Sequence, residues 1–153
     1  AKFPWENMKA DFEGWHDDIN TIIDLANRDE CYLWALYKRP VNTSWSSARA
    51  TILGDAAHAT LPYLAQGAAM AIEDGAVLAR ALGQCDDIAE ALQLYQRNRM
   101  ERTARVVNTS DANRKLFHLK NVDEIRDSFA KRDEGGDRNA WLYSYNPLTV
   151  ELV

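Results

Sequence analysis

The sequence predicts an α/β fold with α+β character in this chain, where helices dominate and a few strands belong to a mixed sheet. Three observations support this prediction. Apolar residues recur every three or four positions in several long stretches, which is typical of amphipathic helices. Two short stretches are instead rich in aromatic or β-branched residues, and the second ends in Gly-Asp. The 153 residues, 46% of them hydrophobic, suffice for one domain with a core.

The first predicted helix covers residues 5–26. One face of it collects the apolar side chains Met8, Phe12, Trp15, Ile19, Ile22 and Ile23. Gly14 weakens this helix without cancelling the pattern. The next stretch, CYLWALYKRP (residues 31–40), has apolar side chains at both parities and ends at Pro40. It predicts a strand that is buried on both faces or has one face against an aromatic pocket.

A second strand is predicted at residues 50–53, followed by a turn at Gly54 and a helix that begins around Gly67. The periodicity of this helix favours a narrow inward stripe formed by Ala69, Ile72, Ala76 and Ala79. Glu73, Asp74 and Arg80 fall outside the stripe. Because Glu73 and Asp74 are adjacent, they point apart on a helix, and we expect them to be solvated or to bond back to the turn.

A longer helix is predicted from an N-cap at Asp86 or Asp87 toward Leu119, with a break near residues 108–110. Its expected features are the inward residues Ile88, Leu92 and Tyr95, an ion pair from Glu101 to Arg105, and the solvent or subunit-contact arginines Arg97, Arg99, Arg102 and Arg105. Asn121 and Glu124 form the pattern of a capping box for a helix that ends near Arg132, at DEGGD. An irregular aromatic tail follows.

Composition and charge exclude several kinds of protein. A formal charge of -5 and a pI near 5.2 disfavour binding to nucleic acid or to an anionic membrane surface. No apolar run has the length of a membrane span, and no signal peptide is evident. Cys31 and Cys85 form no CxxC pair, and we expect reduced, buried thiols in a cytoplasmic protein without a bound metal. The sequence does not begin with Met, which fits a segment of a longer polypeptide.

The chemistry concentrates in residues 54–75, GDAAHATLPYLAQGAAMAIEDG. Asp55 follows a strand at the edge where ligands of α/β folds bind, and its carboxylate suits sugar-type hydroxyls. The first amides of the next helix, at Gly67, Ala68 and Ala69, have no intrahelical acceptor and suit an electron-rich ligand oxygen. A polyol acceptor beside a donor-rich helix start fits a flat heterocycle with a polyhydroxyl chain, such as a flavin.

Residues 54–82 closely resemble the second flavin-binding motif of the single-component FAD-dependent aromatic hydroxylases, which include salicylate and hydroxybenzoate hydroxylases. The shared pattern is G-D-A-A-H, a proline four positions later, Q-G, and an E-D pair six residues beyond. The rest of the chain resembles, more loosely, the salicylate and 6-hydroxynicotinate branch. The resemblance implies the C-terminal part of a p-hydroxybenzoate-hydroxylase-like FAD-binding fold. The G-x-G-x-x-G loop with which these enzymes begin has no counterpart here.

The resemblance also implies roles for single residues. Asp55, after Gly54, would hold the ribityl hydroxyls of FAD, and Pro62 would lie beside the reactive edge of the isoalloxazine. The amides of Gly67, Ala68 and Ala69 would bind the pyrimidine-side flavin oxygen. Gln66 would lie near flavin and substrate. Candidates for the substrate pocket are Tyr63, Tyr32 and Trp34.

Each of these residues also has a simpler structural interpretation. Asp55 without the motif is more typical of a helix cap or turn than of a ligand-binding acid, and the aromatics Tyr32, Trp34 and Tyr37 are typical of a core. His58 is expected to be a packed imidazole that bonds to nearby backbone rather than a base.

The expected regions are residues 1–49, from the substrate-binding sheet, residues 50–82, with the flavin motif, and residues 83–153, helical with an aromatic tail. By resemblance, the whole enzyme reduces FAD with NADH or NADPH. It then transfers oxygen, derived from molecular oxygen, from a flavin C4a-hydroperoxide to an aromatic acid such as salicylate, hydroxybenzoate or hydroxynicotinate.

The general base is expected in the missing N-terminal part, so this segment alone would be inactive, and late helices of such enzymes often pack in homodimers. Two alternatives remain open: a flavoprotein epoxidase or halogenase, and a non-catalytic helical interaction or dimerisation module.

Overall fold

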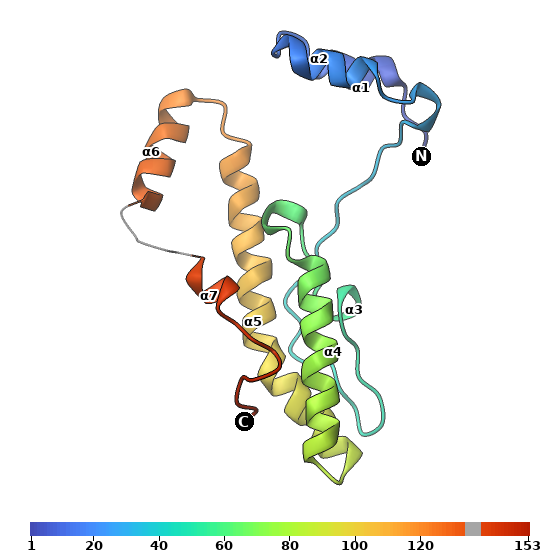
Figure 1. Cartoon of the computed structure of the whole chain (residues 1–153), viewed down its shortest axis with the longest axis vertical. Helices are drawn as coiled ribbons and strands as arrows, with labels where there is room; N and C mark the ends of the chain where they lie inside the picture. Colours follow the sequence, from blue (N-terminus) through green and yellow to red (C-terminus); the bar gives the residue numbers. More distant parts are fainter. Residues whose placement is uncertain (134–138) are drawn as a thin grey trace. The chain divides into compact units, whose positions relative to one another are not determined.

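The structure, a computed structural model, describes residues 1–133 and 139–153, and the chain divides into two compact units, residues 1–36 and 37–153. Helices dominate both units (Figure 1), so the predicted helix-rich character is confirmed. The first unit contains α1 (Trp5–Ala10), α2 (Asp17–Asp24) and the short 3-10 helix η1 (Arg28–Glu30). The helical segments of the second unit are α3 (Asp55–His58), η2 (Pro62–Leu64), α4 (Gly67–Gln84), α5 (Ile88–Phe117), α6 (Val122–Asp133) and α7 (Ala140–Tyr143).

The first unit contains two helices where the sequence predicted one over residues 5–26, so that prediction is wrong. Gly14 has φ +80, a left-handed conformation in which an α-helix cannot continue. His16 then begins α2 as its N-cap, because its Nδ1 accepts from the Asp18 N–H at 3.2 Å. The two helices are joined at their buried side by Trp5, whose indole N–H donates to the Ile23 carbonyl at 3.1 Å.

The two predicted strands at residues 31–40 and 50–53 are not strands. In the described parts of the chain, β pairing is limited to two isolated bridges, Lys2 with Tyr32 and Ser46 with Thr51. The side chain of Trp34 is 81% exposed, so the pattern that predicted burial on both faces is also wrong. A strand needs neighbouring strands to satisfy its N–H and C=O groups, and the described residues supply no sheet on which these apolar side chains could pack.

The core of the second unit lies between α4 and α5, which run alongside each other (Figure 1). Its central cluster consists of Trp45, Ala57, Val77, Ala81, Leu94 and Tyr95. The Tyr95 hydroxyl donates to the Ile52 carbonyl at 3.2 Å and so fastens the segment before Gly54 to α5. Near the start of the second unit, the Arg39 N–H donates to the Ala59 carbonyl at 2.9 Å.

The predicted helix from Gly67 is confirmed, but its predicted inward stripe is wrong. Ile72 is 73% exposed, and the buried residues of α4 are Met70, Asp74, Val77 and Ala81. These four recur at intervals of four, three and four residues, which is one face of a helix. The inclusion of Asp74 in this face is possible because α5 supplies charged partners for its carboxylate.

The predicted N-cap of α5 is confirmed at Asp87, whose Oδ1 accepts from the Glu90 N–H at 2.9 Å. Leu92 and Tyr95 face inward as predicted, whereas Ile88 is exposed. The predicted break near residues 108–110 is absent, since α5 runs unbroken to Phe117. Ser110 is buried in this part of α5. Its hydroxyl donates to the Leu61 carbonyl at 2.6 Å and so attaches the loop before η2 to α5.

The cap predicted for α6 is confirmed, because Asn121 Oδ1 accepts from the Asp123 and Glu124 N–H groups at 2.9 and 3.4 Å. The predicted stop at DEGGD lies largely outside the described residues. The predicted irregular tail contains the short helix α7, and Arg80 binds the rest of it through the Pro147 and Val150 carbonyls, both at 2.7 Å. Over the described residues, no helix combines the length and apolarity that crossing a bilayer requires.

Candidate functional site

An open groove of about 690 Å³ lies between the Gly54 turn, η2 and the first two turns of α4. Five of the residues predicted for a cofactor site line it: Gly54, Asp55, Pro62, Gly67 and Ala68. The remaining lining residues are Leu53, Thr60, Ala65 and Ala71. Residues up to 18 positions apart in sequence, from Leu53 to Ala71, therefore form one concave surface, and most of its side chains are small.

Gly54 adopts a backbone conformation that the groove requires. Its φ of 57 and ψ of -141 lie in a region that is populated almost exclusively by glycine. A Cβ atom at this position would also lie 3.3 Å from the Cβ of Ala71 on α4. The glycine thus permits the sharp turn and the close approach of the turn to α4.

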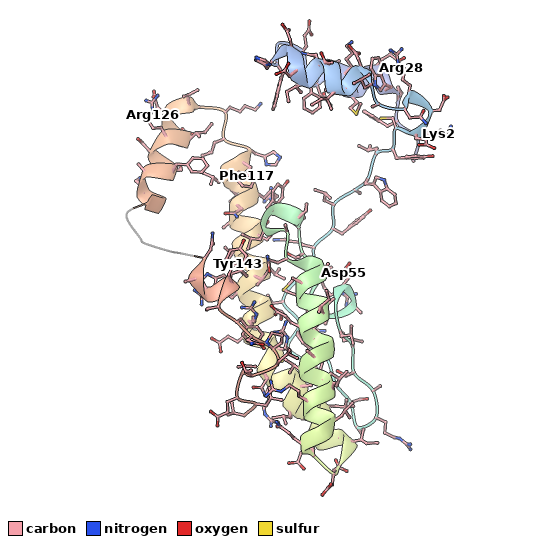
Figure 2. All side chains as sticks on the ribbon, viewed as in Figure 1. Lys2, Arg28, Asp55, Phe117, Arg126 and Tyr143 are labelled. Carbon is pink, nitrogen blue, oxygen red and sulfur yellow. The ribbon has the colours of Figure 1, made fainter. Side chains whose placement is uncertain are left out.

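Asp55 is the first residue of α3, and its exposed side chain borders the groove beside α4 (Figure 2). Among the described residues its carboxylate has no hydrogen-bond or ion-pair partner. It is therefore available as an acceptor for hydroxyl groups of a ligand in the groove.

The N-terminus of α4 supplies hydrogen-bond donors. The first intrahelical bond is donated by Met70 N–H to the Gln66 carbonyl, at 2.9 Å. The three preceding amides, of Gly67, Ala68 and Ala69, have no acceptor within residues 1–133 and 139–153, and the Gln66 side chain does not cap the helix. These amides and the helix dipole favour an electron-rich oxygen at this end of the groove.

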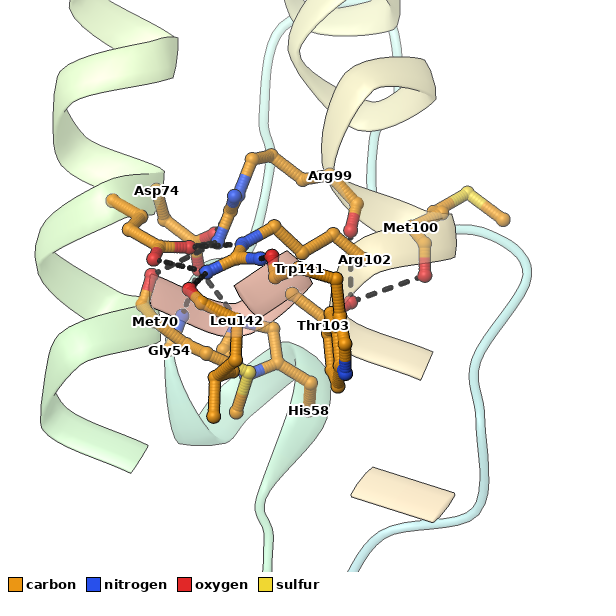
Figure 3. Close-up of polar contacts among 11 residues, drawn as sticks. Gly54, His58, Met70, Asp74, Arg99, Met100, Arg102, Thr103, Trp141 and Leu142 are labelled. Atoms are coloured by element: carbon orange, nitrogen blue, oxygen red, sulfur yellow. Dashed lines mark hydrogen bonds and ion pairs between the residues drawn. The ribbon is translucent and has the colours of Figure 1, made fainter. Parts of the chain in front are cut away.

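A buried network of charges centres on Asp74 and includes a contact to Gly54 of the groove lining (Figure 3). Asp74 Oδ2 accepts from the Gly54 N–H at 2.9 Å and pairs with His58 Nε2 at 2.6 Å, while Oδ1 accepts from Arg99 Nε at 2.7 Å. Arg99 also donates to Glu73 at 2.7 Å. The network therefore joins the Gly54 turn, α3, α4 and α5.

Arg102 extends the network toward the C-terminus. Its Nη2 and Nε donate to the two Glu73 oxygens at 2.7 and 2.8 Å, a bidentate pair. The same guanidinium donates to the carbonyls of Trp141 and Leu142, at 3.2 and 3.0 Å. Its carbon also lies 3.9 Å from the centroid of the Tyr145 ring, a cation–π arrangement. Residues 139–145 are thereby attached to α4 and α5.

The network keeps both acids ionised. Burial alone would raise the pKa of Asp74, but hydrogen bonds from His58, the Gly54 N–H and Arg99 outweigh it and hold that pKa below its usual value. Burial likewise acts to raise the pKa of Glu73, and the Arg102 and Arg99 guanidinium groups lower it overall. Both carboxylates are therefore charged partners rather than proton donors at neutral pH.

Most residues of this network lie in other surroundings than their sequence pattern predicts. Arg99 was expected in solvent or at a subunit contact, yet its side chain is fully buried, and Arg102 is nearly so. His58 is packed as predicted but pairs with the Asp74 carboxylate instead of backbone. Asp74 accepts a hydrogen bond from the Gly54 N–H, which confirms the prediction that it bonds back to the turn rather than being solvated. The spacing of Asp74 from Met70 and Val77 is a signal in the sequence that places it on the buried face.

The other predicted site residues lie outside the groove lining. Gln66 is half-buried at the N-cap of α4, and Ala69 follows the lining pair Gly67 and Ala68. Tyr63 is half-buried, and its ring centroid lies 5.9 Å from those of Phe117 and His118. Their predicted roles stay predictions.

The first unit contains the two further pocket candidates, Tyr32 and Trp34, which are both exposed. The alternative that they and Tyr37 form a core is therefore wrong. Cys31 and Cys85 are free thiols, half-buried rather than fully buried as predicted. Within residues 1–133 and 139–153, no three His, Cys, Asp or Glu side chains form a group that could hold a metal ion.

The residues that line the groove lie within a stretch of sequence that matches a known protein family. The chain belongs to the family described as "FAD binding domain", whose model matches residues 10–110. The family resemblance inferred from residues 54–82 is therefore confirmed.

The relatives of known activity are aromatic-ring monooxygenases. The chain is 43% identical over 150 residues to 6-hydroxynicotinate 3-monooxygenase of Pseudomonas fluorescens, covering 97% of this chain and 34% of that protein. It is 38% identical over 146 residues to 3-hydroxybenzoate 6-hydroxylase of Polaromonas naphthalenivorans, covering 92% of this chain and 36% of that protein. It is also 38% identical over 148 residues to 3-amino-4-hydroxybenzoate 2-monooxygenase PtnB3 of Streptomyces platensis, covering 95% and 37%. The chain thus spans about a third of the length of these relatives.

The fold has a solved counterpart. The structure is similar to Klebsiella pneumoniae HpxO complexed with FAD and uric acid, with a TM-score of 0.75 and 24% sequence identity. The similarity covers 86% of this chain and 35% of HpxO. It supports the predicted fold, the helix-rich part of an FAD-binding protein.

Proposed function

We propose that this chain is the C-terminal part of a longer FAD-dependent monooxygenase, the parent protein, which hydroxylates an aromatic carboxylic acid with NADH or NADPH and molecular oxygen. The observation that carries the proposal is the groove. Five residues of the flavin motif, which are Gly54, Asp55, Pro62, Gly67 and Ala68, line one concave surface. The named relatives support the substrate class, because their names specify hydroxybenzoates, aminohydroxybenzoates and hydroxynicotinate.

The residues of the groove fit a flavin. A Cβ at Gly54 would lie only 3.3 Å from the Cβ of Ala71, and the absence of a side chain there keeps this part of the groove wall free of bulk. Three amides without acceptors in the described residues begin α4, two of them at the lining residues Gly67 and Ala68, and the Asp55 carboxylate, also without a partner there, lines the α3 side. This pairing of donors with an acceptor matches the pyrimidine oxygen and the ribityl hydroxyls of one FAD molecule.

The roles proposed for the residues follow from this fit and from the family motif. Asp55 accepts hydrogen bonds from the ribityl hydroxyls, and the amides of Gly67, Ala68 and Ala69 stabilise negative charge on the pyrimidine side. Pro62 lies beside the reactive edge and Gln66 near flavin and substrate. Tyr63, Tyr32 and Trp34 contribute to the substrate pocket. FAD, when bound, supplies electron transfer from NADH or NADPH and activation of oxygen, while the protein supplies binding, orientation and electrostatics.

The proposal assigns the remaining parts of the chain to the same enzyme. Residues 1–49 belong to the substrate-binding region, residues 50–82 to the flavin site and residues 83–153 to a helical region that supports it. The pyrophosphate loop and the general base belong to the N-terminal part of the parent protein. The parent protein is a cytoplasmic enzyme, and residues 83–153 contribute to a homodimer.

The test is reconstitution of the purified parent protein with FAD, followed by NADH and NADPH oxidation with a panel of hydroxylated benzoates and nicotinates. Product analysis by mass spectrometry is expected to find a substrate gaining one oxygen atom. An epoxide or a halogenated product would instead indicate a related flavoprotein with different chemistry. A parent protein that purifies colourless and takes up no FAD would favour a non-catalytic interaction module and overturn the proposal.

A further inference from the structure

We infer that Asp74 is a positioning residue of the flavin site, because its buried carboxylate clamps both ends of α3 and so fixes the direction of Asp55 into the groove. This inference rests on the proposed function. Asp74 does not itself line the groove, and its side chain is fully buried. Any effect of Asp74 on a ligand must therefore pass through the residues that it holds.

One oxygen atom of Asp74 holds the two ends of α3. Oδ2 accepts from the N–H of Gly54, the N-cap of α3, at 2.9 Å, and pairs with Nε2 of His58, its last residue, at 2.6 Å. A helix of four residues has almost no stability of its own, because too few hydrogen bonds form to offset the ordering of its backbone. The clamp accounts for the persistence of α3 and of the unusual Gly54 conformation.

The clamp is fixed from its other side by α5. Oδ1 of Asp74 accepts from Arg99 Nε at 2.7 Å, and both side chains are fully buried. Arg99 in turn donates to Glu73, which Arg102 grips through two hydrogen bonds. With Oδ2 engaged by the Gly54 turn and α3 and Oδ1 engaged by α5, the Asp74 carboxylate is fixed in position. Because Asp55 directly follows Gly54, fixing Gly54 also fixes the direction in which the Asp55 side chain leaves the backbone.

The test is a double-mutant cycle for FAD affinity in the parent protein. The dissociation constant for FAD is measured for the wild type, Asp74→Asn, Asp55→Ala and the double variant, at a temperature where all four are folded by circular dichroism. Asn is nearly isosteric with Asp, but its amide NH₂ cannot accept a hydrogen bond, so the contacts on one side of the clamp are lost. Asp74→Asn is expected to weaken binding tenfold or more when Asp55 is present and less than threefold when residue 55 is Ala.

A matched control separates positioning from general loss of stability. Thr103 is also fully buried on α5, and within the described residues its hydroxyl donates to the Arg99 and Met100 carbonyls of its own helix. Thr103→Val is expected to change FAD affinity less than twofold. If Asp74→Asn fails to fold, His58→Leu, which removes one end of the clamp, is expected to give the same non-additive pattern in the cycle with Asp55→Ala.

The outcomes distinguish this inference from the proposed function. Equal loss of affinity from Asp74→Asn in both backgrounds, or no loss in either, overturns the positioning role while FAD binding by the wild type stands. The same holds if Asp55→Ala leaves affinity unchanged, because Asp74 would then have nothing to act through. Failure of the wild type to bind FAD overturns the proposed function and this inference together.

Discussion

Arg102 on α5 grips Glu73 on α4 through two hydrogen bonds, Nη2 to Oε1 at 2.7 Å and Nε to Oε2 at 2.8 Å. The same guanidinium donates to the Trp141 and Leu142 carbonyls, so one side chain ties together two long helices and the C-terminal segment. A bidentate pair of this kind depends on the planar fork of Arg, which Lys does not offer.

Arg102→Lys is therefore expected to loosen residues 139–145 without unfolding the chain. The lost hydrogen bonds to Glu73 and to the carbonyls cost about 1.5–3 kcal/mol. Hydrogen exchange by mass spectrometry is expected to show faster exchange of the Leu142, Tyr143 and Ser144 amides, which bond within α7 and its N-cap. Arg97→Lys, at an exposed position on the same helix, serves as the control and is expected to leave that exchange unchanged.

Stability is expected to fall in acid because of Glu73 and Asp74. Both have a lower pKa in the folded chain than when unfolded, so their contribution is complete above the unfolded values near 4. It is lost as pH falls from these unfolded values toward and through the lower folded-state values. Chemical denaturation of the parent protein between pH 7 and pH 3 measures this loss.

Glu73→Gln identifies the source of the acid sensitivity. The variant is expected to be roughly 1–3 kcal/mol less stable at pH 7, since charge-assisted hydrogen bonds are weakened, and to lose less stability on acidification. Asp123→Asn removes an exposed charge that pairs with Arg126 and is expected to change neither value appreciably. An equally steep acid dependence for Glu73→Gln would show that other groups control it.

Gly54→Ala is expected to destabilise the parent protein by roughly 1–3 kcal/mol, because Ala is strained at φ +57 and its Cβ would crowd Ala71. Gly83→Ala is the matched control, since a Cβ there meets nothing within 4 Å and the residue is helical. That control is expected to stabilise by about 0.5–1 kcal/mol. Thermal unfolding followed by circular dichroism compares the two, and equal effects would refute the conformational argument.

Asp55→Ala is expected to raise the dissociation constant for FAD at least tenfold, equivalent to about 1.4 kcal/mol of binding free energy. Unfolding of the FAD-free protein is expected to change little, because the Asp55 side chain is exposed and has no partner in the described residues. Asp86→Ala, an exposed acid away from the groove, is the control. Flavin fluorescence titration measures both, and unchanged affinity in Asp55→Ala would refute the assigned role.

The sequence predicted local features well where short-range chemistry decides them. The caps at Asp87 and Asn121 and the helix that starts at Gly67 depend on neighbouring residues, so their patterns were sufficient. Five of the residues predicted for the cofactor site line one groove. This was predictable because the turn at Gly54 and the small side chains at the start of α4 belong to one short stretch of sequence.

Features that depend on distant partners were not predictable from local patterns. The aromatic stretch at residues 31–40 follows the rules for a strand, but strand formation requires neighbours in a sheet. Asp74 and Arg99 bear charges typical of surfaces, and their burial is favourable only because each neutralises the other across α4 and α5. The pairing of two positions 25 residues apart is not contained in the periodicity of either helix.

The most direct test of a flavin site in this groove is a crystal structure of the parent protein with FAD. The predicted result is an isoalloxazine in the groove, with a pyrimidine oxygen within about 2.7–3.2 Å of the amides at Gly67, Ala68 or Ala69 and a ribityl hydroxyl at Asp55. An isoalloxazine bound elsewhere, with this groove empty, would contradict the central claim.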